Sequence, residues 1–247
     1  MSVVTILALG AVMVATSFLS GLFGMAGGLV LIGVLLFLLP VPLAMALHSV
    51  TQIACNVWRA LLWRRHIRRR TAVTYGAGCL VALAVWSVWR YVPGLPTALV
   101  FLGVVPFLAR LVPARVRPRP ENALHAVGLG MLCMTLMLLT GVAGPVLDQF
   151  FLNGRLDRRE IVATKGACQM FGHGVKLVYF GGIVGGAGMP DPALALLAVA
   201  AAVTGTGLSK RFLEAMGDDC FRRWAGRLVT AISGWYVGYG AWLMAAG

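Results

Sequence analysis

Long apolar stretches alternate with short basic ones along almost the whole chain. The apolar stretches with a helical pattern cover 3–20, 28–39, 44–63, 72–90, 95–112, 122–141, 144–152, 160–180, 191–208 and 224–246. Most are long and apolar enough to cross a hydrocarbon core of about 30 Å. The pattern therefore predicts an all-α integral membrane protein with eight to ten transmembrane or partial helices.

Two of the apolar segments are too short to cross a bilayer. At a rise of 1.5 Å per residue, 28–39 and 144–152 cover only about half of the hydrocarbon core. Each follows a glycine-rich break, "SGLFGMAGG" at 20–28 and "TGVAGP" at 140–145. Short, Gly-interrupted segments at corresponding positions in two halves are typical of discontinuous helices in transporters. We therefore expect a half-helix after each break.

The two halves of the chain repeat one pattern of polar positions. "ALHSVTQIACNVWRALL" aligns with "ATKGACQMFGHGVKLVY" at an offset of 117, and the glycines of the two breaks align at an offset of 120. This sets two polar quartets opposite each other, both with spacings of four, four and three: His48, Gln52, Asn56 and Arg59, and Lys165, Gln169, His173 and Lys176. Each quartet covers an arc of about 80° on one helix face. We expect one repeat in residues 1–120 and a second in 121–247.

Composition and charge indicate how these helices are oriented. The sequence is 60% hydrophobic and only 12% charged, yet its formal net charge is +13. The Lys and Arg residues are concentrated between apolar segments, at 64–70, 110–120, 154–160, 209–211 and 222–227. Because short basic loops are retained in the cytoplasm, we expect these stretches inside and both termini outside, with no nucleic acid as a partner. An odd number of crossings or partial crossings per half would make the two repeats inverted.

The quartets are the first candidate for a substrate pathway. Charged side chains inside a membrane are costly and usually face a bundle interior or a water-filled path. The end members Arg59, Lys165 and Lys176 could instead extend to the interface. The central members cannot, and for them interhelical hydrogen bonding is the alternative; they are Gln52, Asn56, Gln169 and His173. The shared spacing in both halves favours a pathway lined by these side chains, facing each other across one central cavity.

The glycine breaks are the second candidate. They contain Gly21, Gly24, Gly27 and Gly28 in the first half and Gly141 and Gly144 in the second. These residues let the backbone turn within the membrane, and each half-helix then begins with unpaired N–H groups. Such a helix N-terminus attracts anions through its N–H donors and its dipole. Close packing of helices through small residues is the alternative.

Further chemistry is sparse in this chain. Asp148 stands alone as a carboxylate within an apolar stretch; it could pair with Lys165, take up a proton or end the half-helix near the interface. No Ser–His–Asp order, H-E-x-x-H motif, C-x-x-C pair or other metal-ligand spacing occurs. We therefore expect no enzymatic activity, no metal and no cofactor. The alternatives are an integral-membrane enzyme with His173 as its acid/base and a non-transporting assembly or sensor subunit.

Two stretches carry a family resemblance. "SGLFGMAGGLVLIGVLLFLLPVPLAMALHSVTQ" and "TGVAGPVLDQFFLNGRLDRREIVATKGACQMFGHGVKLVYFGG" resemble the paired repeats of the TauE/SafE sulfite exporter family, also called toluene-sulfonate uptake permeases. The resemblance implies a multi-pass transporter of the bacterial inner membrane for sulfite, a sulfonate, sulfoacetate or a similar anion. It further implies coupling to protons. From the inverted repeats we expect alternating access, and a homodimer is compatible with the sequence. The glycine breaks match the family's glycine turns, and Gln169, His173 and Lys176 match its second-repeat run.

The second quartet is the expected centre of anion binding. An anion that leaves water needs compensating charge and hydrogen-bond donors in place of its hydration shell. Lys176 offers a cation and Gln169 an uncharged donor. Histidine is the side chain whose ordinary pKa lies near neutral pH, so His173 is the candidate proton carrier, with Asp148 as the second.

Overall fold

The chain folds entirely into helices where its structure is described. The computed structural model describes residues 3–23, 26–113, 115, 118–152, 156–184, 189–215 and 218–246. Within these ranges there are ten α-helices, one 3₁₀ turn and one π-helical turn, and no strand. The all-α membrane architecture predicted from the apolar pattern is confirmed.

The helices follow the predicted segments closely. They are α1 Val3–Phe23, α2 Ala26–Leu38, α3 Val41–Leu62, α4 Arg69–Trp89, α5 Leu95–Leu111, α6 Ala123–Thr140, α7 Gly144–Leu152, α8 Arg158–Val178, α9 Pro192–Ala215 and α10 Asp218–Ala246. The turns are η1 Arg64–His66 and η3 Tyr179–Ile183. Among the described helices, α1, α4, α6 and α9 are long and apolar enough to cross a membrane. The basic stretches 209–211 and 222–227, which the pattern placed between helices, lie within α9 and α10.

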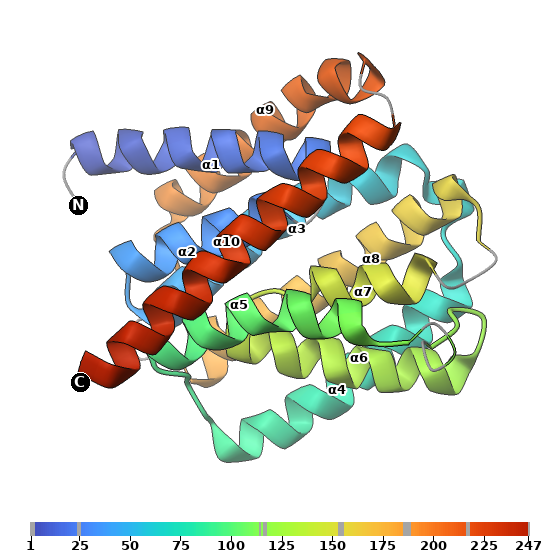
Figure 1. Cartoon of the computed structure of the whole chain (residues 1–247), viewed down its shortest axis with the longest axis horizontal. Coiled ribbons are helices and arrows are strands. Elements are labelled where there is room, and N and C mark those ends of the chain that lie inside the picture. The colour runs from blue at the N-terminus through green and yellow to red at the C-terminus, as the bar shows by residue number, and fades with distance from the viewer. Residues whose placement is uncertain are drawn as a thin grey trace.

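The two short helices reverse the direction of the chain. Figure 1 shows α1 running from left to right and α2 returning to the left, whereas α6 runs leftward and α7 turns back to the right. The α6–α7 reversal depends on Gly141, which has a φ of 87° and ends α6 in the left-handed conformation. Glycine adopts this conformation without the steric cost of a Cβ atom. The half-helices expected after the two breaks are therefore present as α2 and α7.

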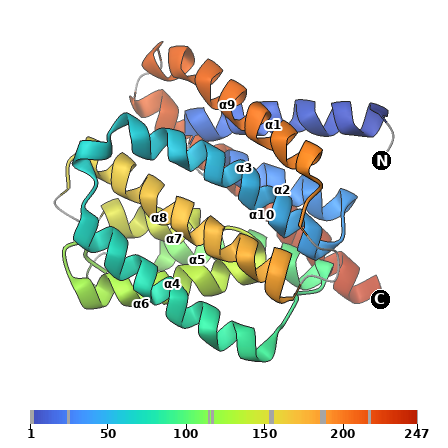
Figure 2. The same ribbon diagram turned by 180° about the vertical axis from the view of Figure 1, so that it is seen from behind.

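Helices of the two halves pack in corresponding pairs. α1 packs on α9 as α6 packs on α4, α3 contacts α9 as α8 contacts α4, and α2 contacts α10 as α7 contacts α5. In addition, α3 packs on α8 and α5 packs on α10. If α1 to α5 are taken to correspond in order to α6 to α10, every one of these pairs has its counterpart in the set. Corresponding helices run in opposite directions (Figures 1 and 2). The arrangement supports two inverted repeats over 1–120 and 121–247, which stay a prediction.

The α3–α8 pair brings the two quartets together. Gly166 on α8 lies so close to α3 that an added Cβ would come within 3.2 Å of the Asn56 carbonyl oxygen and the Ala60 nitrogen. The two helices are antiparallel in Figures 1 and 2, so the start of α3 lies beside the end of α8. This close contact places both polar stripes inside the protein.

α8 begins with a complete capping box. The Asp157 side chain accepts hydrogen bonds from the backbone N–H groups of Arg159 (2.7 Å) and Glu160 (2.9 Å), and the Glu160 carboxylate accepts one from the Asp157 N–H (3.2 Å). Three otherwise unpaired backbone donors at the helix start are satisfied in this way. The hydrogen bond from the Glu160 N–H is the main cause that lowers the pKa of Asp157 below its ordinary value.

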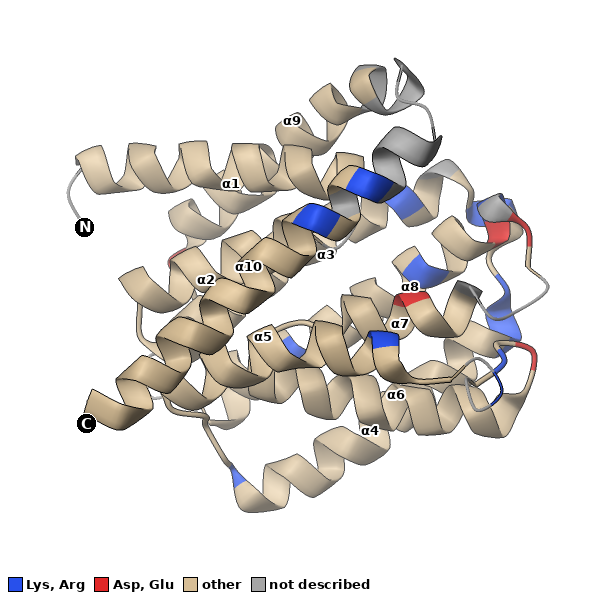
Figure 3. Ribbon diagram, in the orientation of Figure 1, with Lys and Arg blue, Asp and Glu red and all other residues tan. Residues whose placement is uncertain are grey.

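Charge is distributed unevenly between the two ends of the bundle. α1 begins and α10 ends on one side of the molecule (Figure 1), and most Lys and Arg positions lie toward the other side (Figure 3). α3 ends and α4 begins on that basic side, and α7 ends and α8 begins there as well (Figure 1). This distribution supports cytoplasmic basic connections with both ends of the chain outside, which stays a prediction.

Candidate functional site

Lys176 is a fully buried cation near the end of α8. None of its surface is exposed, and its Nζ lies 2.9 Å from Nδ1 of His48 on α3. The same Nζ donates a 2.9 Å hydrogen bond to the carbonyl oxygen of Gly141 at the end of α6. No carboxylate among the described side chains forms an ion pair with Lys176. An ammonium group has three N–H donors, and these two contacts use two of them.

His48 connects Lys176 to the first glycine break. Its Nε2 lies 3.1 Å from the carbonyl oxygen of Gly28 in the first turn of α2. Because a carbonyl oxygen only accepts, Nε2 carries the proton, and Nδ1 is left to accept from Lys176. His48 is therefore a neutral ring fixed by two contacts in this structure. The sequence pattern included His48 in the first quartet but assigned it no binding role, although its alignment with Lys165 was a signal for one.

His173 completes this group of basic side chains. Its ring is 2% exposed and lies edge-on to the His48 ring, with the centroids 5.4 Å apart. Its Nδ1 is buried and has no hydrogen-bond partner among the described residues. We call His48, His173 and Lys176 the basic cluster. It combines one buried ammonium, two imidazoles and no carboxylate of the described chain.

Three amide side chains, which we call the central amides, lie between the basic cluster and the other end of the α3–α8 pair: Gln52, Asn56 and Gln169. Gln52 and Gln169 are each 8% exposed, and Asn56 is fully buried. Asn56 donates a 2.8 Å hydrogen bond to the Gln52 carbonyl oxygen on its own helix, while its Oδ1 has no partner within the described chain. A Cβ on Gly28 would come 3.3 Å from the Gln52 side chain, so the α2 backbone packs directly on this amide.

The remaining quartet members form a separate group, which we call the paired cluster. Lys165 makes an ion pair with Asp148 on α7, and Arg59 donates a hydrogen bond to the carbonyl oxygen of Ser20 near the end of α1. Arg59 follows His48 by 11 residues, or about 16 Å along α3. The structure therefore brings the cationic residues together as two groups at opposite ends of the helix pair. Of the three interpretations of Asp148, pairing with Lys165 is the one observed.

The glycines of the breaks have different roles. Gly27 and Gly28 lie in the first turn of α2 and Gly144 begins α7, so their N–H groups stand at helix starts. The contacts to the basic cluster, however, come from the carbonyl oxygens of Gly28 and Gly141. Gly21 lies within α1, where a Cβ would come 1.8 Å from the Ser209 hydroxyl, so it serves close packing on α9. Gly24 lies outside the described residues.

This arrangement favours binding of an anion over catalysis. The basic cluster offers an ammonium donor and an imidazole nitrogen without a partner, both shielded from solvent, and charge-assisted hydrogen bonds are strong in such surroundings. Within the described chain no group of three or more His, Cys, Asp or Glu side chains is placed to hold a metal ion.

Comparison with known families identifies the chain. A family model described as sulfite exporter TauE/SafE matches residues 8–236. The chain belongs to the sulfite exporter TauE/SafE family. The match includes both glycine breaks, the basic cluster and the paired cluster, and it confirms the resemblance seen in the sequence. Among curated proteins and solved structures, no significant match to the chain is found.

TauE/SafE membership gives the broad function. The family is one of membrane transporters for sulfur-containing anions, and the apolar helices of this member agree with a membrane location. A transporter family is also consistent with the expected lack of enzymatic activity. The buried polar side chains of this TauE/SafE protein include the basic cluster and the central amides.

Proposed function

We propose that this protein moves a sulfur-containing oxyanion, such as sulfite, a sulfonate or sulfoacetate, across the bacterial inner membrane by proton-coupled alternating access. The observation that carries the proposal is the complete burial of Lys176 without a carboxylate partner in the described chain. Removing a charge from water costs several kcal/mol unless an opposite charge compensates it. A bound oxyanion provides that compensation.

The contacts of Lys176 orient its ammonium group for this role. His48 Nδ1 and the Gly141 carbonyl oxygen hold Nζ from two sides, each at 2.9 Å, and leave one donor for the ligand. His173 Nδ1 supplies a second contact when it carries a proton. The amide groups of Gln52 and Gln169 lie next along the helix pair and complete an uncharged donor set. Together these groups replace the hydration shell of an oxyanion.

Proton coupling follows from the two histidines. Neutral imidazoles next to a cation leave the cluster with a single positive charge, and a proton taken up at His173 adds a second one. An arriving anion favours that protonation, and loss of the proton favours release of the anion. Asp148, the second candidate carrier, is already paired with Lys165 and lies at the other end of the helix pair. The geometry therefore favours His173 over Asp148.

Alternating access is supported by the packing of the two halves. Each helix pair between the halves has a counterpart, and corresponding helices run in opposite directions, as an inverted-repeat transporter requires. The basic cluster and the paired cluster lie toward opposite ends of the α3–α8 pair. The residues of the basic cluster and the two glutamines are at most 8% exposed in this structure.

Flux measurements in proteoliposomes test the proposal. Purified protein is reconstituted, and uptake and efflux of radiolabelled sulfite, sulfoacetate and taurine are measured with and without a pH gradient. We expect saturable flux of at least one of these anions, accelerated by a gradient that drives protons in the coupled direction. Flux that equals that of protein-free liposomes for every anion would contradict transport. Flux that ignores the pH gradient would contradict proton coupling alone.

A further inference from the structure

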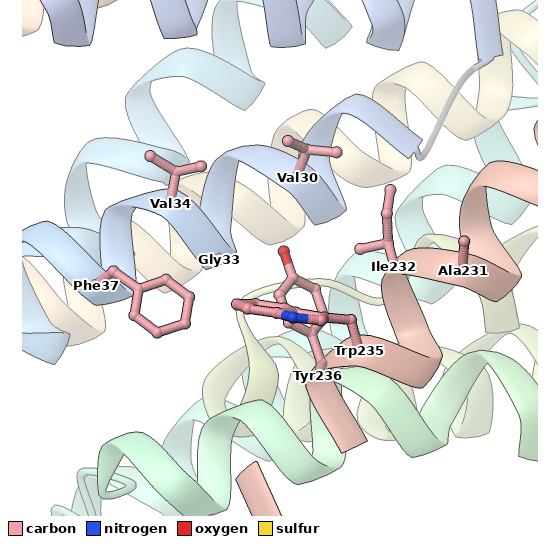
Figure 4. Close-up of a pocket in the computed structure, with 8 residues that line it drawn as sticks. All are labelled: Val30, Gly33, Val34, Phe37, Ala231, Ile232, Trp235 and Tyr236. Atoms are coloured by element: carbon pink, nitrogen blue, oxygen red, sulfur yellow. The ribbon is translucent and has the colours of Figure 1, made fainter. Parts of the chain in front are cut away.

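An apolar groove runs along the surface between α2 and α10. Figure 4 shows Phe37 of α2 on the side of Trp235 of α10, and the same hollow is lined by Val30, Val34 and Ile232. The hollow has a volume of about 410 Å³ and is lined almost entirely by apolar atoms. Phe37 and Trp235 remain 41% and 54% exposed, although their ring centroids are only 5.5 Å apart. The groove therefore presents hydrocarbon and aromatic surface outward.

Gly33 and Tyr236 fix the depth of this groove. Tyr236 is 4% exposed, and its hydroxyl donates a 2.8 Å hydrogen bond to the Leu29 carbonyl oxygen of α2. A Cβ on Gly33 would come 1.9 Å from that hydroxyl, so only glycine leaves room for the ring. Trp235 stacks on Tyr239 with the ring planes within 2° and the centroids 5.2 Å apart. The walls are thus held in place by contacts within the protein.

A basic hollow continues the groove toward the start of α10. It has a volume of about 490 Å³ and shares Ala231 with the apolar groove. Three arginines line it: Arg110 of α5, and Arg223 and Arg227 of α10. Arg110 donates a 2.8 Å hydrogen bond to the Thr230 hydroxyl, which joins α5 to α10.

The other two arginines of the hollow have no ionic partner. Arg223 and Arg227 form no ion pair or hydrogen bond with the described part of the chain, although the Arg227 guanidinium lies 5.8 Å from the Trp224 ring centroid. All three arginines are exposed. The hollow therefore concentrates positive charge that no described carboxylate neutralises, next to a surface suited to hydrocarbon.

The dimensions of this surface match one leaflet of a membrane. From Arg223 to Tyr236 the distance along α10 is about 20 Å, whereas half of a hydrocarbon core is about 15 Å. A ligand with its charge at the arginines would thus reach the aromatic end of the groove with an apolar chain of leaflet length. Basic pockets between transmembrane helices are known to take anionic lipid headgroups.

We propose that an anionic phospholipid binds here, with its phosphate at Arg110, Arg223 and Arg227 and one acyl chain in the groove between α2 and α10. A free anion would leave the apolar groove empty. A second copy of the chain joined by two-fold symmetry would bring its own arginine cluster toward this one, which like charges disfavour. An anionic phospholipid contacts the basic hollow with its phosphate and the apolar groove with its acyl chain.

The site also has a connection to the basic cluster. α2 forms one wall of the groove, and its first turn supplies the Gly28 carbonyl oxygen that holds His48. A lipid that braces α2 against α10 therefore stabilises the helix on which the orientation of His48 depends.

Native mass spectrometry of the purified full-length protein tests the proposal. The protein is mixed with equal amounts of dioleoyl-phosphatidylglycerol and dioleoyl-phosphatidylcholine, and retention of each lipid is compared. We expect preferential retention of phosphatidylglycerol. Arg223→Gln/Arg227→Gln should reduce this preference about thirtyfold, since each basic residue near a membrane surface contributes about one kcal/mol. The matched control, Arg65→Gln/Arg70→Gln, removes two exposed arginines outside the hollow and should leave the preference unchanged.

A second variant tests the hydrocarbon part and does not depend on the arginines. Ala231→Trp places a large side chain on an exposed position at the junction of groove and hollow, and it should lower retention of phosphatidylglycerol without changing the fold. Equal retention of both lipids by the wild type, or equal losses in test and control variants, would overturn the proposal. So would complete displacement of phosphatidylglycerol by millimolar glycerol 3-phosphate, which indicates a free-anion site. A lipid-free species of twice the 26.2 kDa mass that Ala231→Trp converts to monomer would instead identify the groove as a subunit interface and also overturn the proposal.

Discussion

The two lysines of α8 have the same chemistry and opposite surroundings. Lys165 has 15% of its side chain exposed and pairs with the Asp148 carboxylate. Lys176 is fully buried, and within the described chain its polar contacts are with an imidazole nitrogen and a carbonyl oxygen. The charge of Lys165 is therefore neutralised within the chain, whereas Lys176 meets no carboxylate among the described residues. Burial of a cation indicates a binding site only when the protein supplies no counter-charge of its own.

The largest effect is expected when the ligand-facing lysine is neutralised. Lys176→Gln should lower anion affinity by at least about thirtyfold, because truncating one partner of a buried charge pair costs about 2–5 kcal/mol. The fold should persist, since a neutral side chain is easier to bury than a charge. Isothermal titration calorimetry measures the affinity, and proteoliposome flux measures transport.

A paired substitution at the other lysine is the matched control. Asp148→Asn/Lys165→Gln removes a cation and its carboxylate together, so the net charge stays the same and neither member of the ion pair is left without the other. We expect anion affinity within about threefold of the wild type, as for a site without ligand contacts. Wild-type affinity and flux in Lys176→Gln would assign the anion site elsewhere.

The next prediction concerns the proton. His173→Ala should flatten the dependence of flux on pH between pH 6 and 8, because the side chain that changes charge in this range is lost from the basic cluster. Anion affinity at a fixed alkaline pH should change less. His125→Ala removes an exposed histidine at the start of α6 and should leave the pH profile intact. An unaltered pH profile in His173→Ala would move the proton site to another group.

A smaller effect, on stability, is expected when Lys165 is left without a carboxylate, as Lys176 is. Asp148→Asn leaves Lys165 without its carboxylate in a partly buried position, and should lower the free energy of unfolding by about 1–2 kcal/mol. Restoring neutrality with Lys165→Gln in the same chain should recover most of this loss. Thermal unfolding in detergent, followed by circular dichroism, measures both. A single variant as stable as the wild type would show that the pair contributes nothing to stability.

The smallest effect is expected at the cap of α8. The folded-state pKa of Asp157 is lowered, so its contribution to stability is present above the unfolded-state pKa of about 3.9 and is lost as pH falls through the lower folded value. Unfolding temperatures measured between pH 3 and 5 should fall less steeply in Asp157→Asn than in the wild type. Asn retains the capping oxygen, so the two proteins should be similar at pH 7. An identical slope in both would rule out this contribution.

Much of this fold could be predicted from the sequence, because its signals are local. Apolar length defines the membrane helices, and a break is visible wherever glycines interrupt the pattern, as before α2 and α7. The burial of Gln169 and His173 also follows from their place in the middle of a helix that has to satisfy its polar groups internally. The stretch "ATKGACQMFGHGVK" therefore carried much of the information about the site.

The partners of the polar side chains could not be predicted in the same way. Spacing alone does not distinguish Lys165 from Lys176 as a ligand-binding residue. The packing of α7 against α8 brings Asp148 to Lys165, and this contact is not visible in the sequence. The contact of His48 with Lys176 likewise depends on antiparallel packing of two helices far apart in sequence. Gly21 shows the same limit: its neighbour Ser209 lies on α9, so its role in close packing could not be read from the break that contains it.

The link between His48 and Lys176 has a mechanical consequence. Each half of the chain holds its own side chain with its own glycine carbonyl, Gly28 for His48 and Gly141 for Lys176, and the 2.9 Å contact between them joins the halves. That contact exists only while Nδ1 of His48 has a free lone pair. A proton bound there would replace this contact with repulsion between two cations, and the polar connection that it makes between α3 and α8 would be lost. Protonation of one nitrogen atom would thus remove a polar connection between the two halves of the chain.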